Sequence, residues 1–209
     1  KTVKKETRRV FAIISLISMP AGFGLSVMAK EVLTVLFHSR ANEIAVSAFP
    51  LAIISLGTPL LAIGGAVFSM LQAVGKQDVP VKITLIASVI KLGLNVVLVP
   101  VPSLGIAGAA ISTLVSYALI CIMSVRVLFK EIDMSVKAIV TSILPMVGGI
   151  ISSLTAYVCM KVLKETVYFM NRHLLITVIS IANAVIIYIV LLTLLDKYTK
   201  NSLIKEIFK

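Results

Sequence analysis

Long apolar runs, separated by short polar or turn-prone pieces, dominate the pattern of this chain. Six windows each hold the roughly 20 mainly apolar residues that a helix needs to cross the hydrocarbon of a bilayer. They lie at about 10–29, 44–73, 80–100, 105–129, 135–160 and 172–195. Backbone polar groups in lipid must bond to one another, and continuous runs argue against a barrel. The pattern therefore predicts an all-α, polytopic membrane helix bundle with about six transmembrane helices.

The composition supports lipid as the solvent for most of the chain. Apolar residues make up 59% of the 209 residues and charged residues only 14%. An ordinary soluble domain carries roughly 25% charged residues. The mean hydropathy of +1.08 is too high for a globule that must present a polar surface to water. Membrane lipids are thus the first expected partners.

The basic residues predict the orientation. With a cytoplasmic N-terminus, fourteen Lys and Arg residues fall in the inner segments and five in the outer ones. This is the positive-inside bias, so both chain ends are expected in the cytoplasm. The inner set is Lys1, Lys4, Lys5, Arg8, Arg9, Lys76, Lys82, Arg126, Lys130, Lys137, Lys197, Lys200, Lys205 and Lys209, and the outer set is Lys30, Arg40, Lys161, Lys164 and Arg172. Topology explains most of the net charge of +11, and no nucleic-acid partner is expected.

The residues that usually carry chemistry are sparse. Cys121 and Cys159 both fall inside expected spans, where they are small apolar fillers. His38 and His173 have no ligand-like spacing around them. The chain also lacks a phosphate loop, a dinucleotide fingerprint and a nucleophile elbow. We expect no enzymatic activity, no cofactor and no metal site.

Proline and glycine occur inside the apolar windows, where they break or kink helices. We expect a kink at Pro20 in the first window and interruptions of the second and fifth windows at Pro50, Gly57, Pro59, Gly64, Gly65, Pro145, Gly148 and Gly149. Transporters use broken helices as bending points and near substrate sites. Close packing of small residues without movement is the alternative. Pro20, Pro59 and Gly57 are the hinge candidates.

A polar face lies on the third window. Thr84, Ser88, Lys91 and Asn95 have the spacing that places them on one side of a helix. A lysine near mid-span costs about 2.5–3.5 kcal/mol on insertion scales, so this face should turn toward protein or water. Either Lys91 lines a hydrated cavity and meets an anionic group, or it bonds to Asn95, serine hydroxyls and carbonyls inside the bundle. No acidic residue lies in an expected span to neutralise it.

Several runs, taken in order, resemble a known family. They are Met19-Pro20-Ala21-Gly22, Leu33–Phe37, Leu71–Lys76, Val79–Lys82, Lys91 with Asn95, Leu98–Pro100 and Leu104–Thr113. Over residues 5–130 the chain resembles the stage V sporulation protein B and polysaccharide-exporter branch of the multidrug/oligosaccharidyl-lipid/polysaccharide flippase superfamily. The last two apolar windows fit by position and hydropathy only.

The resemblance implies a transporter of two six-helix lobes plus two extra helices. It moves lipid-linked oligosaccharide or polysaccharide precursors by alternating access, in spore or cell-envelope formation, across a bacterial plasma membrane. Residues 1–130 would belong to the C-terminal lobe, and residues 131–209 would add two helices and a basic tail. The chain begins with Lys1 rather than Met, so a missing N-terminal lobe is an expected partner. Lys91, Asn95, Ser88 and Thr84 are the substrate-cavity candidates.

Two other classes stay open at this point. One is an ion-coupled multidrug exporter of the same superfamily, which would need a membrane-embedded carboxylate from elsewhere. The other is a non-transporting membrane scaffold, for which compact stripes of small residues would suffice. Gly105, Ala109, Ser112 and Ser116 form such a stripe at helical spacing, and close helix packing is its expected role.

Overall fold

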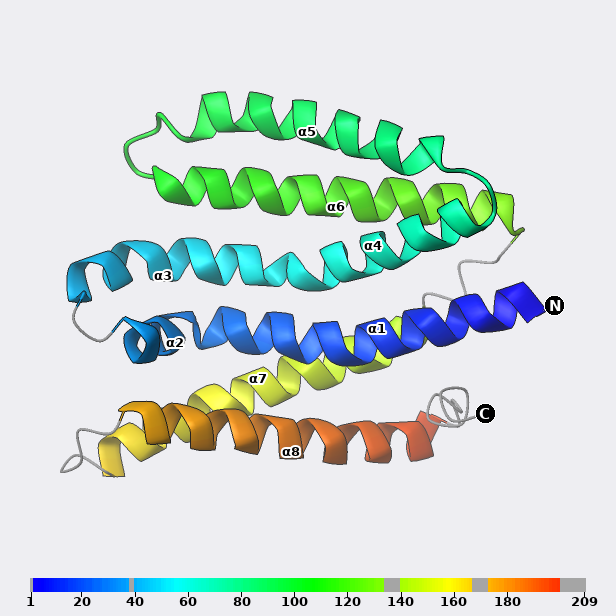
Figure 1. Cartoon of the computed structure of the whole chain (residues 1–209). Coiled ribbons are helices and arrows are strands. Elements are labelled where there is room, and N and C mark those ends of the chain that lie inside the picture. Colours follow the sequence, from blue (N-terminus) through cyan, green and yellow to red (C-terminus); the bar gives the residue numbers. More distant parts are fainter. Residues whose placement is uncertain (1, 38–39, 134–139, 167–172, 200–209) are drawn as a thin grey trace.

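The computed structural model describes residues 2–37, 40–133, 140–166 and 173–199, and these form eight helices joined by short links (Figure 1). The helices are α1 (Thr2–Val27), α2 (Ala29–Leu36), α3 (Ala41–Leu56), α4 (Thr58–Ala73), α5 (Asp78–Leu98), α6 (Ile106–Glu131), α7 (Val140–Thr166) and α8 (His173–Thr199). Lys1, His38, Lys137, Arg172, Lys200, Lys205 and Lys209, which figured in the sequence predictions, lie outside the described residues.

The helices match the predicted membrane spans. Five of them, α1, α5, α6, α7 and α8, are long and apolar enough to cross a bilayer. The pair α3 and α4 passes the same test as one span with a bend, which brings the number to six. The chain is thus a multi-pass membrane protein, and the predicted all-α bundle is confirmed.

The expected interruptions occur at one place only among the described residues. Helix α3 continues through Pro50 and α7 through Pro145, and the glycine pairs within α4 and α7 do not interrupt those helices either, so the interruptions expected there were wrong. Helix α1 also continues through Pro20, where a kink and not an interruption was expected. A proline removes one backbone hydrogen bond, and neighbouring helices can satisfy the freed carbonyl. The real break is at Gly57, where α3 ends, α4 begins and the axis turns by 40°. Pro59 lies in the first turn of α4, where its missing N–H has no intrahelical partner to lose.

Helix α2 is an element that the sequence pattern did not predict. Lys30, Glu31 and the polar residues up to Glu43 indicated a loop. In the structure Met28 and Val32 pack with Ala156 and Met160 of α7, and with Ile176 of α8. A short helix is marginal alone, and α2 also packs against α3, which is its main partner, so tertiary packing is what stabilises it.

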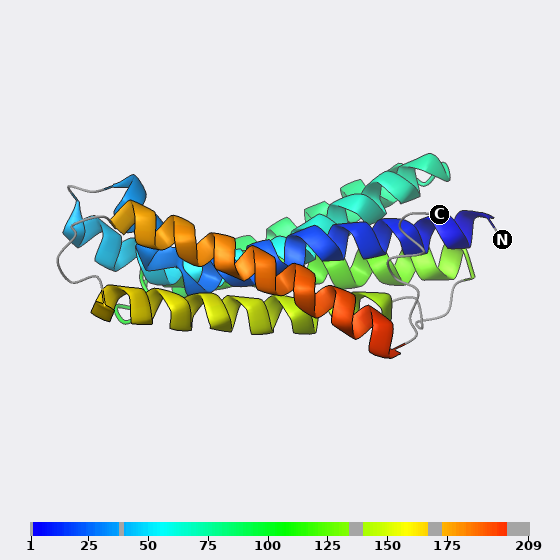
Figure 2. The ribbon, with the colours of Figure 1, turned by 90° about the horizontal axis from the view of Figure 1, so that it is seen from below.

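The bundle is an elongated array rather than a round cluster. Figure 1 shows α5, α6, the bent α3–α4 pair, α1 and α8 side by side, with α7 crossing α1; Figure 2 gives the view from below. The main packing partners follow this order: α5 with α6, α6 with α3 and α4, α1 with α3, α4 and α7, and α7 with α8. The larger apolar core lies between α1, α4 and α6 and includes Phe11, Ile63, Val67, Leu71 and Leu128.

One end of the bundle gathers three segments that were predicted to be cytoplasmic. Lys4 near the start of α1 pairs with Asp133 after α6 at 3.6 Å. Lys76 in the α4–α5 turn pairs with Glu131 at the end of α6 at 3.2 Å. These pairs are solvent-exposed, so each adds little stability. They do show that the N-terminus, the α4–α5 turn and the end of α6 share one face of the membrane.

Candidate functional site

Helix α5 carries the polar face and is the least covered span. Only 11% of its apolar window is buried, against 28% to 39% in the other four single-helix spans. Pro80, Ile83 and Ala87 bury its packed side, which lies against α6. Because the rest of α5 has few neighbours in this chain, its other sides face lipid or a further protein surface.

The four predicted cavity residues do not share one environment. Thr84 and Ser88 are exposed, while Lys91 and Asn95 are partly buried. Asn95 accepts a hydrogen bond from Ser112 of α6 through its side-chain oxygen. About one turn further along α6, Ser116 donates to the Ala87 carbonyl at 3.3 Å. Asn95 therefore joins two helices, and the packing role expected for Ser112 and Ser116 agrees with these contacts.

Lys91 is a cation without a local counter-ion. Across the described ranges it makes no ion pair or hydrogen bond. The alternative in which Lys91 bonds to Asn95 and serine hydroxyls is therefore not what the structure shows. A mid-span ammonium group lowers its free energy by meeting water or an anion. Lys91 keeps that capacity unused among the described residues.

The hinge candidates Pro20, Gly57 and Pro59 lie in the region where α1 packs against α7 on one side and against the α3–α4 break on another. Pro20 on α1 packs beside α7, because a Cβ on Gly149 would come within 3.2 Å of the backbone at Met19 and Pro20. Two residues further along α1, Gly22 faces the α3–α4 break. A Cβ there would lie 2.7 Å from the Pro59 ring and 2.8 Å from the Ser55 carbonyl oxygen. Gly22 thus permits the closest approach of α1 to the bend.

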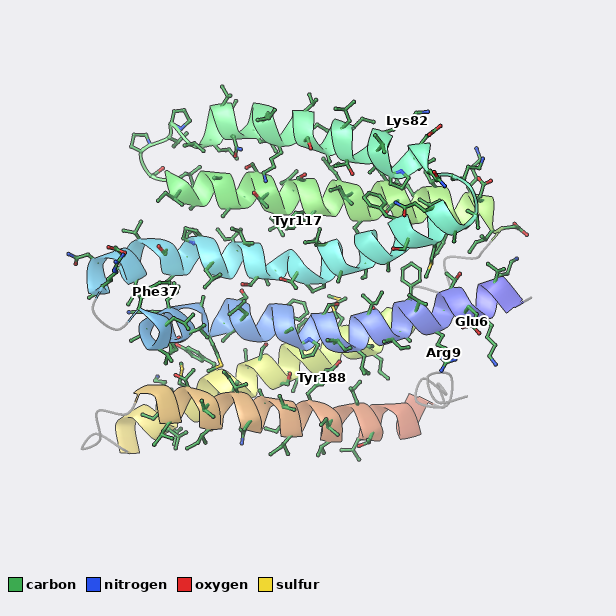
Figure 3. The ribbon with its side chains drawn as sticks, viewed as in Figure 1. Glu6, Arg9, Phe37, Lys82, Tyr117 and Tyr188 are labelled. Atoms are coloured by element: carbon green, nitrogen blue, oxygen red, sulfur yellow. The ribbon has the colours of Figure 1, made fainter. Side chains whose placement is uncertain are left out.

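On its other side, the α3–α4 break packs against α6. A Cβ on Gly57 would lie 2.8 Å from the ring of Tyr117, which Figure 3 places on the side of α6 that faces the bent pair. Gly64, two turns further, similarly admits Ile120 at 3.0 Å. Gly22, Gly57 and Gly64 therefore allow α1 and α6 to pack closely against the bent α3–α4 pair. The sequence named Gly57 and Pro59 but offered no signal for Gly22 or Tyr117 as their contacts.

An apolar groove runs along α1, α7 and α8. Its volume is about 440 Å³, and its lining includes Ile17, Pro20, Gly24, Ala156, Val185 and Tyr188. The hydroxyls on its wall are already engaged: Ser152 and Ser153 donate to carbonyls of their own helix, and Tyr188 donates to the Leu16 carbonyl. The groove therefore offers an apolar surface with no free polar group from these side chains.

The groove and Lys91 form separate features. The lining residues come from α1, α2, α7, α8 and the α1–α2 junction, whereas Lys91 lies on α5 at the other edge of the array (Figure 1). The structure therefore does not assemble the cavity candidates and Pro20 into one site. In the described part of the chain, no three His, Cys, Asp or Glu side chains lie close enough to hold a metal ion.

Comparison with known proteins agrees with a flippase. Residues 1–179 match the family described as lipid II flippase MurJ. A curated relative, the probable low-salt glycan biosynthesis flippase Agl15 of Haloferax volcanii, is 30% identical over 122 residues, which cover 55% of this chain and 25% of the relative. The chain thus spans about a quarter of that relative's length. No solved structure matches.

The flippase superfamily is confirmed, whereas the branch of stage V sporulation protein B is not what the family match identifies. Flippases are transporters rather than catalysts, so the expectation of a non-enzyme is confirmed on that ground. With 179 of 209 residues matched and an all-helical membrane bundle in place, the chain belongs to the lipid II flippase MurJ family.

Proposed function

We propose that this chain is the C-terminal part of a transporter that flips lipid-linked oligosaccharide or polysaccharide precursors across a membrane by alternating access. Family membership over residues 1–179 is the observation that carries the proposal. The glycan-biosynthesis flippase relative supports the same substrate class. The finer assignment, to cell-envelope or spore formation in a bacterial plasma membrane, follows from the resemblance to the sporulation branch.

The proposed architecture has two parts. Residues 1–130 belong to the C-terminal lobe, and residues 131–209 add two helices. An N-terminal lobe supplies the opposite wall of the transport path. The sparse cover of α5, with 11% of its window buried, is compatible with such a wall. The matched stretch also covers only a quarter of the relative.

Lys91 is the proposed contact for the headgroup. Lipid-linked sugars carry phosphate or pyrophosphate, and an unpaired mid-span ammonium attracts such a group in a low-dielectric setting. Asn95 contributes by holding α5 against α6, since its oxygen is engaged with Ser112. Thr84 and Ser88, which are exposed on the same helix, extend the polar track toward the end that carries Asp78.

The test is a flipping assay on the complete protein in liposomes with a fluorescent polyprenyl-pyrophosphate sugar. Lys91→Ala should lower the rate about tenfold or more, because a lost charged contact is worth about 1.5–3 kcal/mol. Lys91→Arg should retain most of the rate because it keeps the charge. The matched control is Lys82→Ala, which removes an exposed lysine from the first turns of the same helix.

The outcomes separate the candidate functions. Full transport by Lys91→Ala would remove Lys91 from the proposal. An absence of flipping by the intact protein, together with export of cationic drugs driven by an ion gradient, would favour the multidrug exporter. If the intact protein moves neither class of compound, a scaffold role becomes the better explanation.

A further inference from the structure

Pro20 leaves one backbone carbonyl in the middle of α1 without its usual hydrogen-bond donor. The ring nitrogen of Pro20 has no hydrogen, so the Leu16 carbonyl one turn earlier loses its helical donor. In lipid no water is present to replace that donor. Helix α1 nevertheless continues from Thr2 to Val27. Some other group must therefore satisfy the Leu16 oxygen.

That group comes from the last helix of the described chain. The Tyr188 hydroxyl of α8 donates to the Leu16 carbonyl oxygen at 2.8 Å. Tyr188 is 6% exposed, and Figure 3 shows it between α8 and α1. The bond joins residues 172 apart in sequence. A buried tyrosine usually finds a hydrogen-bond partner, and here that partner is the carbonyl freed by the proline.

Two glycines of α7 leave room for this contact. A Cβ on Gly148 would lie 3.2 Å from the Tyr188 ring, and one on Gly149 would lie 3.2 Å from the backbone of Met19 and Pro20. The two adjacent glycines thus leave room for the α8 tyrosine and the α1 proline at the same level. The absence of both side chains brings the three helices together there.

We propose that α7 and α8 form a brace for α1, and that Tyr188 is its positioning residue. The Tyr188 hydroxyl replaces the donor that Pro20 lacks and holds α1 continuous across the proline. Breaking the bond frees α1 to bend at Pro20. This assigns a role to the two C-terminal helices that goes beyond transport itself, and it does not depend on the identity of the substrate.

A double-mutant cycle tests the proposal with the full-length protein in lipid nanodiscs. Tyr188→Phe removes the hydroxyl and keeps the ring, so we expect the Tm to fall by roughly 3 °C. In a Pro20→Ala background the backbone at this position regains its N–H and bonds Leu16 directly. Tyr188→Phe should then change the Tm by less than about 1 °C. Tyr157→Phe, an exposed tyrosine on α7, is the control and should leave the Tm unchanged in both backgrounds.

A distance measurement separates bracing from mere packing. Spin labels at residues 5 and 26, with Cys121 and Cys159 replaced by alanine, span about 32 Å of α1 at 1.5 Å per residue. Tyr188→Phe should broaden the distance distribution toward shorter values, and Pro20→Ala should abolish that broadening. Equal Tm losses from Tyr188→Phe with and without the Pro20→Ala substitution, or an unchanged distribution in Tyr188→Phe, would overturn the proposal.

Discussion

Lys91 and Asn95 lie one helical turn apart on α5, and the fold uses them differently. Asn95 is a bridge to α6 through Ser112, whereas Lys91 makes no such bond within the described ranges. An amide can satisfy itself with a neighbouring hydroxyl, but an ammonium in the membrane needs water or an anion. The two residues are therefore expected to respond differently to substitution.

The Asn95–Ser112 bond between α5 and α6 is expected to add little stability. Asn95→Leu should lower the free energy of unfolding by about 0.6 kcal/mol, since interhelical hydrogen bonds in membranes average that value. Ser112 also donates to the Ala109 carbonyl at 2.9 Å, so its hydroxyl stays satisfied and the loss stays small. Reversible unfolding in mixed micelles would measure it. Ser88→Ala, at an exposed position on the same helix, is the control and should leave the free energy of unfolding unchanged. A loss above about 2 kcal/mol in Asn95→Leu would contradict a small contribution from the Asn95–Ser112 bond.

At the scale of the element, the glycines of α1 differ according to what each one faces. Gly22 faces the Pro59 ring and the Ser55 carbonyl, while Gly24 has nothing within 4 Å of its Cβ position. Alanine favours a helix over glycine by about 1 kcal/mol. Overpacking a tight contact against backbone costs about 1–3 kcal/mol.

These opposing terms give a paired prediction. Gly22→Ala should destabilise the protein by up to about 2 kcal/mol, because the clash with a rigid ring and a backbone oxygen exceeds the gain in helix propensity. Gly24→Ala should be neutral or stabilising by up to about 1 kcal/mol. Thermal unfolding of both variants in the same detergent would show the difference. Equal effects at the two positions would mean that α1 does not pack closely against the α3–α4 break at Gly22.

The whole molecule has two ends with different surroundings. The N-terminus, the α4–α5 turn and the end of α6 lie at one end, joined by the Lys4–Asp133 and Lys76–Glu131 pairs. The end of α2, the start of α3 and the α5–α6 turn lie at the other (Figure 1). The structure sets these groups apart, and the positive-inside bias indicates which of them faces the cytoplasm.

Cysteine labelling would check that orientation in intact cells. In a variant lacking Cys121 and Cys159, a cysteine introduced in place of Arg40 should react with a membrane-impermeant maleimide without permeabilisation. A cysteine in place of Gln77, in the exposed α4–α5 turn, should react only after the membrane is opened. The reverse pattern would show that the orientation predicted from charge is wrong.

The pattern of apolar and polar residues along the chain is enough to predict the class of the molecule. Apolar runs long enough to span a bilayer, and polar pieces too short to fold alone, leave few alternatives to a helix bundle. The polar face of α5 and the position of Gly57 with Pro59 also follow from local pattern, because helical spacing and the missing proline N–H act within a turn or two.

The role of each local feature, in contrast, depends on contacts between helices. At Pro20 a donor from another helix is present: the Tyr188 hydroxyl of α8 satisfies the Leu16 carbonyl, and α1 continues. Helix α2 forms where α3 and α8 pack against it. Lys91 and Asn95 share a helix face by spacing, but they differ in their contacts, because Asn95 accepts a hydrogen bond from the Ser112 hydroxyl. Such contacts join residues far apart in sequence, and no local pattern encodes which of them will meet.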